Sequence, residues 1–422
     1  MTNAGEQPTV IVRMADAGDL YMSWRWSGND YSRGASMLPE AEIVEALRLL
    51  VDALPNPADP DALERALTTG AFAAYDTEYR VAQALSRALL PYGLAEQLYD
   101  LHVRGVRPHI RLQPSPRVAQ VPWEIIAPSP DLRLVDIADV SLLAPASIVH
   151  APGRKANSWN ETRELPVVAV LDPRVPGFRA DSALGSVLGR MESDTPLARR
   201  VAEYSAQQRL LPAVADPTAA FRRTDIDRTW LSAALRQGAS RLTYVGHVTA
   251  AAPESGQSED AQLHLACAAD TIGFATPTRV HRPLSAKDLL LGTHTLDPEP
   301  AAGAHLWPIP SRVALIACES GGDLRFSEAL GLVAAMINNG AELVTASRWP
   351  LPTDLAFQRL AGAAPDAHPL QDAICSIDTA HEQPDPVATL AEWQRKRLTA
   401  WRTERTIPHS PILWSAFATV RA

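Results

Sequence analysis

The stretch that decides the fold covers residues 312–349 and reads RVALIACESGGDLRFSEALGLVAAMINNGAELVTASRW. It opens with an apolar run, residues 313–317, which is typical of a strand buried on both faces of a parallel sheet. Cys318 follows directly. After a small polar loop and a helix that ends at Gly340, residues 343–346 begin another strand. The pattern places the Cys318 thiol at the carboxyl end of a core strand, where open α/β sheets bind their ligands.

Strand and helix patterns alternate through this half of the chain. Ser327 is positioned to cap a helix whose apolar face holds Leu330, Val333, Ala334 and Ile337. Upstream, residues 166–171 predict a buried strand, and residues 197–210 and 227–237 predict helices. The alternation implies right-handed crossovers and therefore a parallel sheet flanked by helices.

A second strand pattern supplies a candidate base for the thiol. Residues 241–246, RLTYVG, are followed at once by His247. A thiol is a weak nucleophile at its ordinary pKa, whereas an imidazole titrates near neutrality and can accept the thiol proton. If the two strands lie side by side, His247 and Cys318 emerge at the same sheet edge. The pair predicts acyl transfer, with amide hydrolysis as the expected outcome.

A strand followed by His, together with a strand followed by Ala-Cys-x-Ser-Gly, resembles the CHAT family of caspase-like cysteine peptidases, the relatives of caspases and separase. Further pieces resemble the family and keep its order from about residue 105 to the end: PWEII (122–126), LSAKDLLL (284–291), RWPLPTD (348–354) and SPILWSAFATV (410–420). The resemblance implies an α/β fold in which a caspase-like, mostly parallel sheet is flanked by helices, with an α+β N-terminal region packed on it.

The resemblance also implies the roles of the site residues. His247 and Cys318 form the catalytic dyad, and the backbone N–H groups of Val248 and Cys318 form the oxyanion hole. The family usually has glycine after the histidine. Val248 keeps the N–H group but loses the conformational freedom of glycine. An alternative is therefore a catalytically inactive CHAT-like scaffold, an interaction module in which Val248 records the loss of catalysis.

Four residues near the nucleophile in sequence are candidates for substrate binding. A carboxylate among Glu319, Asp323 and Asp354 would favour a basic residue before the scissile bond, although all three can also be solvated loop acids. Trp349 follows the strand after the nucleophile, where caspase-like enzymes line the substrate cleft with an aromatic side chain. A role in the core or at a hinge is the alternative for this tryptophan.

Composition restricts the class of partner. The chain has 422 residues, 46% hydrophobic content and a formal net charge of −9, which argues against nucleic acid or an anionic membrane as the main partner. Three cysteines without CxxC spacing and histidines without i, i+4 spacing predict no disulfide framework, metal site or cofactor. The first residues lack a signal-peptide pattern, and no apolar run is long enough to span a bilayer. We expect a cytoplasmic protein.

The chain divides into three predicted parts. Residues 1–105 form an α+β region with a strand pair, 9–14 and 20–26, and helices at 39–54, 60–67 and 71–90. Residues 106–155 turn to β patterns, including VPWEII at 121–126, and form the scaffold portion of the CHAT module. The linker 151–165 leads into the catalytic domain, 156–422.

The resemblance further implies how such a peptidase is used. A cytoplasmic peptidase must be restrained, so we expect low basal activity on its protein substrate. A regulatory partner protein would bind the N-terminal region or the loops. Residues 249–260, directly after the base, are either a flap over the cleft or the tip of a hairpin. Bacterial CHAT proteins often belong to defence or programmed-death modules, and the resemblance implies such a role here.

Overall fold

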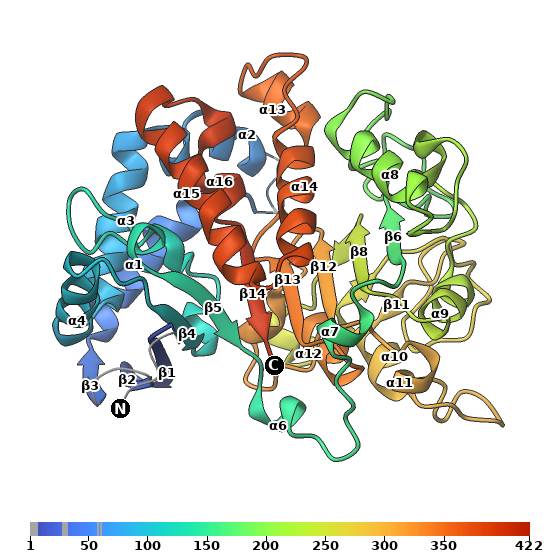
Figure 1. Cartoon of the computed structure of the whole chain (residues 1–422), viewed down its shortest axis with the longest axis horizontal. Coiled ribbons are helices and arrows are strands. Elements are labelled where there is room, and N and C mark those ends of the chain that lie inside the picture. The colour runs from blue at the N-terminus through green and yellow to red at the C-terminus, as the bar shows by residue number, and fades with distance from the viewer. Residues whose placement is uncertain (1–6, 28–32, 57–58, 60) are drawn as a thin grey trace. The chain divides into compact units, whose positions relative to one another are not determined.

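The structure is a computed structural model that describes residues 7–27, 33–56, 59 and 61–422 (Figure 1). Its contacts divide the chain into two compact units. The first unit comprises Met1–Leu143, Ala356–Pro365 and Asp385–Thr419, and the second comprises Ala144–Leu355, Asp366–Pro384 and Val420–Ala422. The three-part division expected from the sequence stays a prediction.

The first unit is built on strands in the order β3-β2-β1-β4-β5. Their bounds are β1 (Thr9–Ala17), β2 (Asp19–Ser27), β3 (Arg33–Leu38), β4 (His109–Gln113) and β5 (Asp139–Leu143). The first three are antiparallel and β1, β4 and β5 are parallel. The expected strand pair is confirmed, since β1 and β2 meet in a hairpin at Gly18, whose φ of 79° suits glycine. The sequence analysis missed β3.

Helices complete the first unit. They are α1 (Glu40–Ala53), α2 (Ala62–Thr68), α3 (Tyr75–Leu89), α4 (Tyr92–Val103), α5 (Leu134–Ile137), α15 (Pro386–Glu404) and α16 (Pro411–Trp414). Helices were expected near α1, α2 and α3, and all three are present. Residue 60, the expected start of the second helix, lies outside the described residues. A fully buried ion pair, Arg133 with Glu78 at 3.2 Å, ties α3 to the start of α5.

The PWEII piece differs from expectation. Residues 121–126 were expected to be β, but Trp123–Ile125 form a 3-10 turn that the ring of Pro122 starts. Proline lacks the N–H group that a strand ladder requires, and this explains the difference. Trp123 is buried, as a core role requires.

The second unit contains the parallel sheet expected from the sequence. Its strand order is β13-β12-β8-β6-β7, and every neighbouring pair within it is parallel. The strands are β6 (Val167–Leu171), β7 (Leu210–Leu211), β8 (Arg241–Val245), β12 (Arg312–Ile316) and β13 (Leu343–Ser347). All residues of β6, β8, β12 and β13 are buried, which explains their nearly continuous apolar sequences. The mostly parallel α/β fold is confirmed.

Helices and a small antiparallel sheet surround these strands. The helices are α6 (Ala146–Val149), α7 (Trp159–Thr162), α8 (Pro196–Ala206), α9 (Arg228–Arg236), α10 (Ala286–Leu291), α11 (Gly303–Leu306), α12 (Leu332–Asn338) and α14 (Pro369–Glu382). The small sheet has the order β11 (Leu284–Ser285), β10 (Gln262–Leu263) and β9 (Val248–Thr249). Because β9 and β10 are antiparallel, residues 250–261 connect the two strands of a hairpin. Helix α13 (Asp354–Leu360) spans the boundary of the two units, and β14 (Phe417–Arg421) is the last strand.

The helix after Cys318 begins later than its sequence pattern suggested. It was expected to start near Ser327, but α12 begins at Leu332. Asp323, rather than Ser327, caps the first turn of this helix. The Asp323 carboxylate accepts a 2.8 Å hydrogen bond from the N–H of Ala334. A residue distant from the helix start thus replaces the expected local cap, and the segment between Cys318 and α12 becomes a longer loop.

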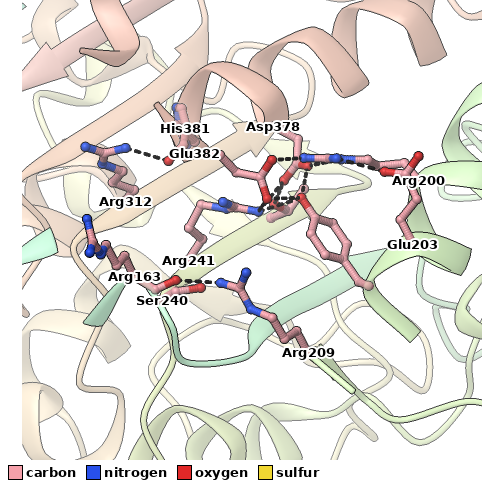
Figure 2. Close-up of polar contacts among 12 residues, drawn as sticks. Arg163, Arg200, Glu203, Arg209, Ser240, Arg241, Arg312, Asp378, His381 and Glu382 are labelled. Atoms are coloured by element: carbon pink, nitrogen blue, oxygen red, sulfur yellow. Dashed lines mark hydrogen bonds and ion pairs between the residues drawn. The ribbon is translucent and has the colours of Figure 1, made fainter. Parts of the chain in front are cut away.

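A buried ionic cluster holds α8 and α14 on one face of the second unit's sheet (Figure 2). Arg241, at the start of β8, is 1% exposed and lies 3.4 Å from Asp378 and 3.2 Å from Glu382 of α14. Arg200 of α8 contacts Asp378 at 2.8 Å. The Tyr204 hydroxyl donates to Asp378, and burial raises the pKa of Tyr204. These contacts lie at the amino ends of the strands and leave the carboxyl ends for the candidate site.

Candidate active site

His247 and Cys318 follow two neighbouring parallel strands. Strands β8 and β12 pair in register up to Val245 and Ile316, and the N–H of Gly246 continues the ladder with a 3.3 Å bond to the carbonyl of Ile316. His247 and Cys318 each lie two residues beyond this last registered pair. The two candidate residues therefore leave the sheet at equivalent positions and at the same edge.

The hydrogen bond of His247 determines which nitrogen can act as a base. Its Nε2 atom lies 3.0 Å from the carbonyl oxygen of Gly185, in the loop after β6. A carbonyl only accepts, so Nε2 carries the proton and Nδ1 is left with its lone pair. Burial lowers the pKa of His247, while Gly185 and Asp172 oppose that shift. The imidazole is consequently neutral at pH 7.

Asp172 organises the loop that holds His247, and the sequence analysis did not identify it as a site residue. It follows β6, is fully buried and adopts a φ of 50°. Its carboxylate accepts hydrogen bonds from four groups: the Ser186 hydroxyl at 2.6 Å, the N–H of Val187 at 3.2 Å, the N–H of Leu188 at 3.3 Å and Arg222 at 3.2 Å. An Asp directly after a buried strand at the ligand-binding edge was the signal that could have revealed it.

Hydrogen bonds from Tyr244 hold the backbone around His247 in place. The Tyr244 hydroxyl lies 2.7 Å from the carbonyl of His247 and 2.9 Å from that of His264. The N–H of His264 also donates to the His247 carbonyl, at 3.1 Å. Gly246 is required here, because a Cβ atom would lie 2.8 Å from the Tyr244 hydroxyl oxygen. The turn from β8 into β9 is therefore closely constrained.

Val248 keeps its N–H group available. The Val248–Leu263 pair of β9 and β10 is flanked by the bond from the N–H of His264 to the carbonyl of His247. In an antiparallel ladder, the two residues of such a pair are not hydrogen-bonded to each other. Their N–H groups point away from the partner strand. Valine is suited to this extended conformation, and its side chain is 8% exposed. The local backbone thus has no need of the glycine that the family usually carries.

A buried histidine pair supports β9. His264 Nδ1 lies 3.0 Å from His281 Nε2, and His281 Nδ1 lies 2.9 Å from the carbonyl of Cys267. The carbonyl requires a proton on His281 Nδ1, so His264 donates from Nδ1 and its Nε2 accepts from the Thr249 hydroxyl at 2.9 Å. Burial lowers the pKa of His264 to about 3. Both rings are neutral and have hydrogen-bond partners on both nitrogens.

The surroundings of Cys318 favour the protonated thiol. Burial raises its pKa and the Glu319 carboxylate raises it further, while a backbone contact with Leu351 partly opposes the shift. Within the described chain, His247 and Cys318 share no hydrogen bond: the imidazole is bound toward the loop after β6 and the thiol contacts the segment after β13. The two strands are neighbours, but no hydrogen bond joins the candidate base and nucleophile among the described residues. The resting pair is a protonated thiol and a neutral imidazole.

The acidic candidates next to Cys318 have separate surroundings. Glu319 has a φ of 51°, is partly exposed and lies 3.4 Å from Arg325. Asp323 is 4% exposed and binds the first turn of α12, and burial raises its pKa to about 7. Glu319 therefore pairs with a partly exposed arginine, whereas Asp323 has a structural contact.

The two remaining candidates are buried. Trp349 is 1% exposed, which matches the core alternative stated for it above. Asp354 is 8% exposed, accepts a 2.7 Å bond from the N–H of Leu370 and lies 3.7 Å from His368. Burial raises the pKa of Asp354. Among the four acidic and aromatic candidates, Glu319 is the one with partial exposure and a side-chain partner that can move away.

The other cysteines lie apart from this arrangement. Cys267 is buried, and burial raises the pKa of Cys375 to about 12. Over the described residues, no group of His, Cys, Asp and Glu side chains is placed to hold a metal ion. None of the helices in the same residues has the length and apolar character needed to cross a bilayer.

Comparisons with known proteins identify the fold and the family of the chain. A chain in the 3.0 Å crystal structure of the Saccharomyces cerevisiae separase–securin complex shares the fold, with a TM-score of 0.50 and 9% sequence identity. The alignment covers 98% of this chain and 30% of that chain, so this chain spans less than a third of the separase length. A comparison with curated proteins gives no match. The CHAT domain matches residues 79–422, and the chain therefore belongs to the CHAT family of caspase-like cysteine peptidases.

Proposed function

We propose that this protein is a latent cysteine endopeptidase that hydrolyses a protein substrate through His247 and Cys318. The observation that carries the proposal is the register of β8 and β12, which brings the two residues to equivalent positions at one sheet edge. The bond between His247 Nε2 and Gly185 adds a second argument, because it leaves Nδ1 free to act as the base. No cofactor is needed for this chemistry.

In the first half of the reaction, Nδ1 of His247 accepts the thiol proton and the sulfur attacks the peptide carbonyl carbon. The N–H groups of Val248 and Cys318 stabilise the resulting oxyanion. The outward direction of the Val248 N–H supports this role. When the C–N bond breaks, His247 returns the proton to the leaving amine, and a thioester to Cys318 remains.

In the second half, water replaces the amine. His247 Nδ1 accepts a proton from water as the oxygen attacks the thioester carbon, and the same two N–H groups stabilise the second oxyanion. The C–S bond then breaks and the proton returns to the sulfur. The products are a carboxylic acid, an amine and the regenerated thiol, so the dyad completes a cycle without any other reactant.

The resting state explains why we expect low basal activity. The thiol is protonated because burial and Glu319 raise its pKa, and His247 is not bonded to it. Activation requires the loop between Cys318 and α12 to shift so that the thiol turns toward Nδ1. Binding of a regulatory partner protein to the N-terminal region or the loops is the proposed trigger, in a cytoplasmic setting.

We assign substrate preference to Glu319. Its carboxylate lies next to the nucleophile and already contacts a guanidinium, that of Arg325, at 3.4 Å. A substrate Arg or Lys side chain could replace Arg325 in the activated state. Asp323 and Asp354 are less suited to this role, because they hold backbone N–H groups of α12 and α14. The expected preference is for a basic residue before the scissile bond.

The proposal is tested with a positional peptide library, with and without proteins encoded beside the gene. Cleavage after basic residues that is lost in both Cys318→Ala and His247→Ala supports the proposal. Cys375→Ala is the matched control, because this thiol also has a raised pKa but lies on α14, away from the sheet edge. Cleavage that survives in Cys318→Ala would contradict the assignment.

A scaffold without catalysis is the second candidate function. It is favoured by one observation, the absence of a hydrogen bond between His247 and Cys318 in the described structure. Iodoacetamide distinguishes the two candidates when it is applied after addition of the partner. A latent enzyme gains a Cys318 alkylation rate that depends on His247, whereas a scaffold shows slow alkylation that His247→Ala leaves unchanged.

A further inference from the structure

We propose that the open face of the β1–β2–β3 sheet is a docking surface for an extended acidic segment of a partner protein. We call it the arginine face, and its side chains are those of Ile11, Arg13, Tyr21, Arg25, Arg33 and Met37. The inference concerns binding alone, so it holds whether or not the Cys318 site is catalytic.

The strand register concentrates positive charge on this face. Arg25 of β2 lies directly opposite Arg33 of β3, and Arg13 of β1 is opposite Ser23, which makes it a diagonal neighbour of Arg25. Directly opposed side chains are about 5 Å apart at Cβ, and like charges at that distance destabilise a sheet. A ligand that brings carboxylates between these arginines would relieve the repulsion.

Among the described residues, no acidic side chain neutralises the arginines of this face. No carboxylate in those residues lies within ion-pair distance of Arg13, Arg25 or Arg33. Two acids of this region are engaged elsewhere, since Asp16 and Glu40 contact Arg117 at 2.9 and 3.3 Å. These three exposed arginines have no carboxylate partner among the described residues, in a chain with a net charge of −9. Their placement therefore points to an external anion.

The face carries two shallow, open grooves. One groove of about 650 Å³ is lined by Ile11 and all three arginines, and an adjoining groove of about 460 Å³ is lined by Arg13, Tyr21 and Met37. Gly34 lies opposite Trp24, and a Cβ there would lie 2.1 Å from the tryptophan ring, so glycine allows this ring to pack against β3. The grooves share Arg13, so a single extended chain can follow both.

The apolar part of the face favours a peptide over nucleic acid. Tyr21 is 48% exposed and Met37 is 54% exposed, and they lie opposite each other on β2 and β3. An acidic peptide with alternating apolar residues offers partners both to these side chains and to the arginines. Nucleic-acid affinity comes largely from many contacts of Lys and Arg with phosphates, and this face offers three arginines. We therefore commit to a protein segment rich in Asp or Glu with interspersed apolar residues.

The test uses fluorescence anisotropy with the full chain and two labelled 14-residue peptides. One peptide alternates glutamate with leucine, and the control peptide alternates glutamine with leucine. We expect saturable binding of the glutamate peptide, weakened about tenfold by Arg13→Glu/Arg25→Glu/Arg33→Glu and by 0.5 M salt. Tyr21→Ser/Met37→Ser weakens it to a smaller extent. The matched control reverses three exposed arginines without described ion pairs: Arg190, Arg199 and Arg236.

A measurement that does not depend on the peptide accompanies this one. Arg33→Gln removes the repulsion with Arg25, so it should raise the melting temperature at low salt and leave it nearly unchanged at high salt. The proposal is overturned by absence of saturable binding, by equal affinity for the two peptides, or by equal affinity of the triple variant. It is also overturned if a single-stranded oligonucleotide of equal charge binds more tightly. Self-association that the triple variant abolishes would assign the face to a second copy of the chain instead.

Discussion

The Nε2 atom of His247 donates a 3.0 Å hydrogen bond to the carbonyl oxygen of Gly185, and this bond orients the candidate base. Gly185 belongs to the loop that the Asp172 carboxylate holds through Ser186, Val187 and Leu188. The orientation of His247 therefore depends on a residue that does not touch the reacting atoms, and the dependence can be measured.

Asp172→Ala should reduce the activated enzyme's kcat about 10–100-fold with little change in KM, because it frees the loop that carries Gly185. Asp172→Asn should retain more activity, since an amide oxygen can still accept part of the hydrogen bonds. The measurement is steady-state hydrolysis of a peptide obtained from the library. An Asp172→Ala enzyme with normal kcat would show that Gly185 does not position the base.

The pH dependence of Cys318 alkylation follows from its raised pKa. In the resting protein, iodoacetamide should react slowly at pH 7 and faster only as the pH rises above about 9, the value near which ordinary thiols titrate. His247→Ala should leave this resting profile unchanged, because the two side chains share no hydrogen bond. After activation, the wild-type profile should move to lower pH. Mass spectrometry of the Cys318 peptide supplies the readout, with Cys375 as the internal control.

Asp323 should make stability decrease with rising pH. Its pKa is raised to about 7 in the folded state against an unfolded value of 3.8, so the folded protein binds more protons between these values. The stabilisation is complete below the unfolded pKa and is lost as the pH rises through about 7. Thermal unfolding of wild type and Asp323→Asn at pH 5 and pH 8 checks this sign. The variant should gain relative to wild type at pH 8; an equal difference at both values would rule out titration of Asp323.

The buried cluster beneath α14 should respond strongly to loss of a single partner. Asp378→Ala leaves Arg241 buried with one fewer carboxylate, and such changes typically cost about 3–5 kcal/mol of unfolding free energy. Urea denaturation measures the effect. Glu203→Ala is the matched control, because Glu203 contacts Arg200 from an exposed position and should cost less than about 1 kcal/mol. Similar losses for the two variants would contradict the structural role of the cluster.

Val248→Gly tests whether valine, in place of the glycine usual in the family, restricts the oxyanion hole. If the Val248 N–H is already available, glycine should not raise activity, and it should lower stability by about 0.5–1 kcal/mol because it loosens β9. An increase in kcat of about tenfold or more would instead show that valine restricts the oxyanion hole. Peptide hydrolysis and thermal unfolding of the same preparation give both quantities.

The parts of the fold that sequence predicted well are those with a simple period. The strands ending before His247 and Cys318 are short, apolar and buried on both faces, so their patterns identify parallel strands directly. The first hairpin was equally clear from alternation around Gly18. Strand β3 was missed because Gly34 and the adjacent small residues give it weak β propensity, and its packing against Trp24 is visible only in three dimensions.

The chemistry of the site was less accessible from sequence than its location. Asp172 acts through loop backbone far away in sequence, and no local pattern reports the contact with Leu188. Asp323 was grouped with solvated or substrate-binding acids, yet it binds the N-terminus of α12, whose start the local cap pattern misplaced. Both errors have one cause: a carboxylate's partner is set by tertiary packing, whereas sequence spacing records only its neighbours along the chain.

The most direct test of the central claim is single-turnover labelling of the activated protein with a peptidyl acyloxymethyl ketone that carries arginine in its last position. We predict covalent attachment at Cys318 that is lost in His247→Ala and retained in Cys375→Ala. Attachment at another residue, or labelling of Cys318 at the same rate without His247, would contradict the account.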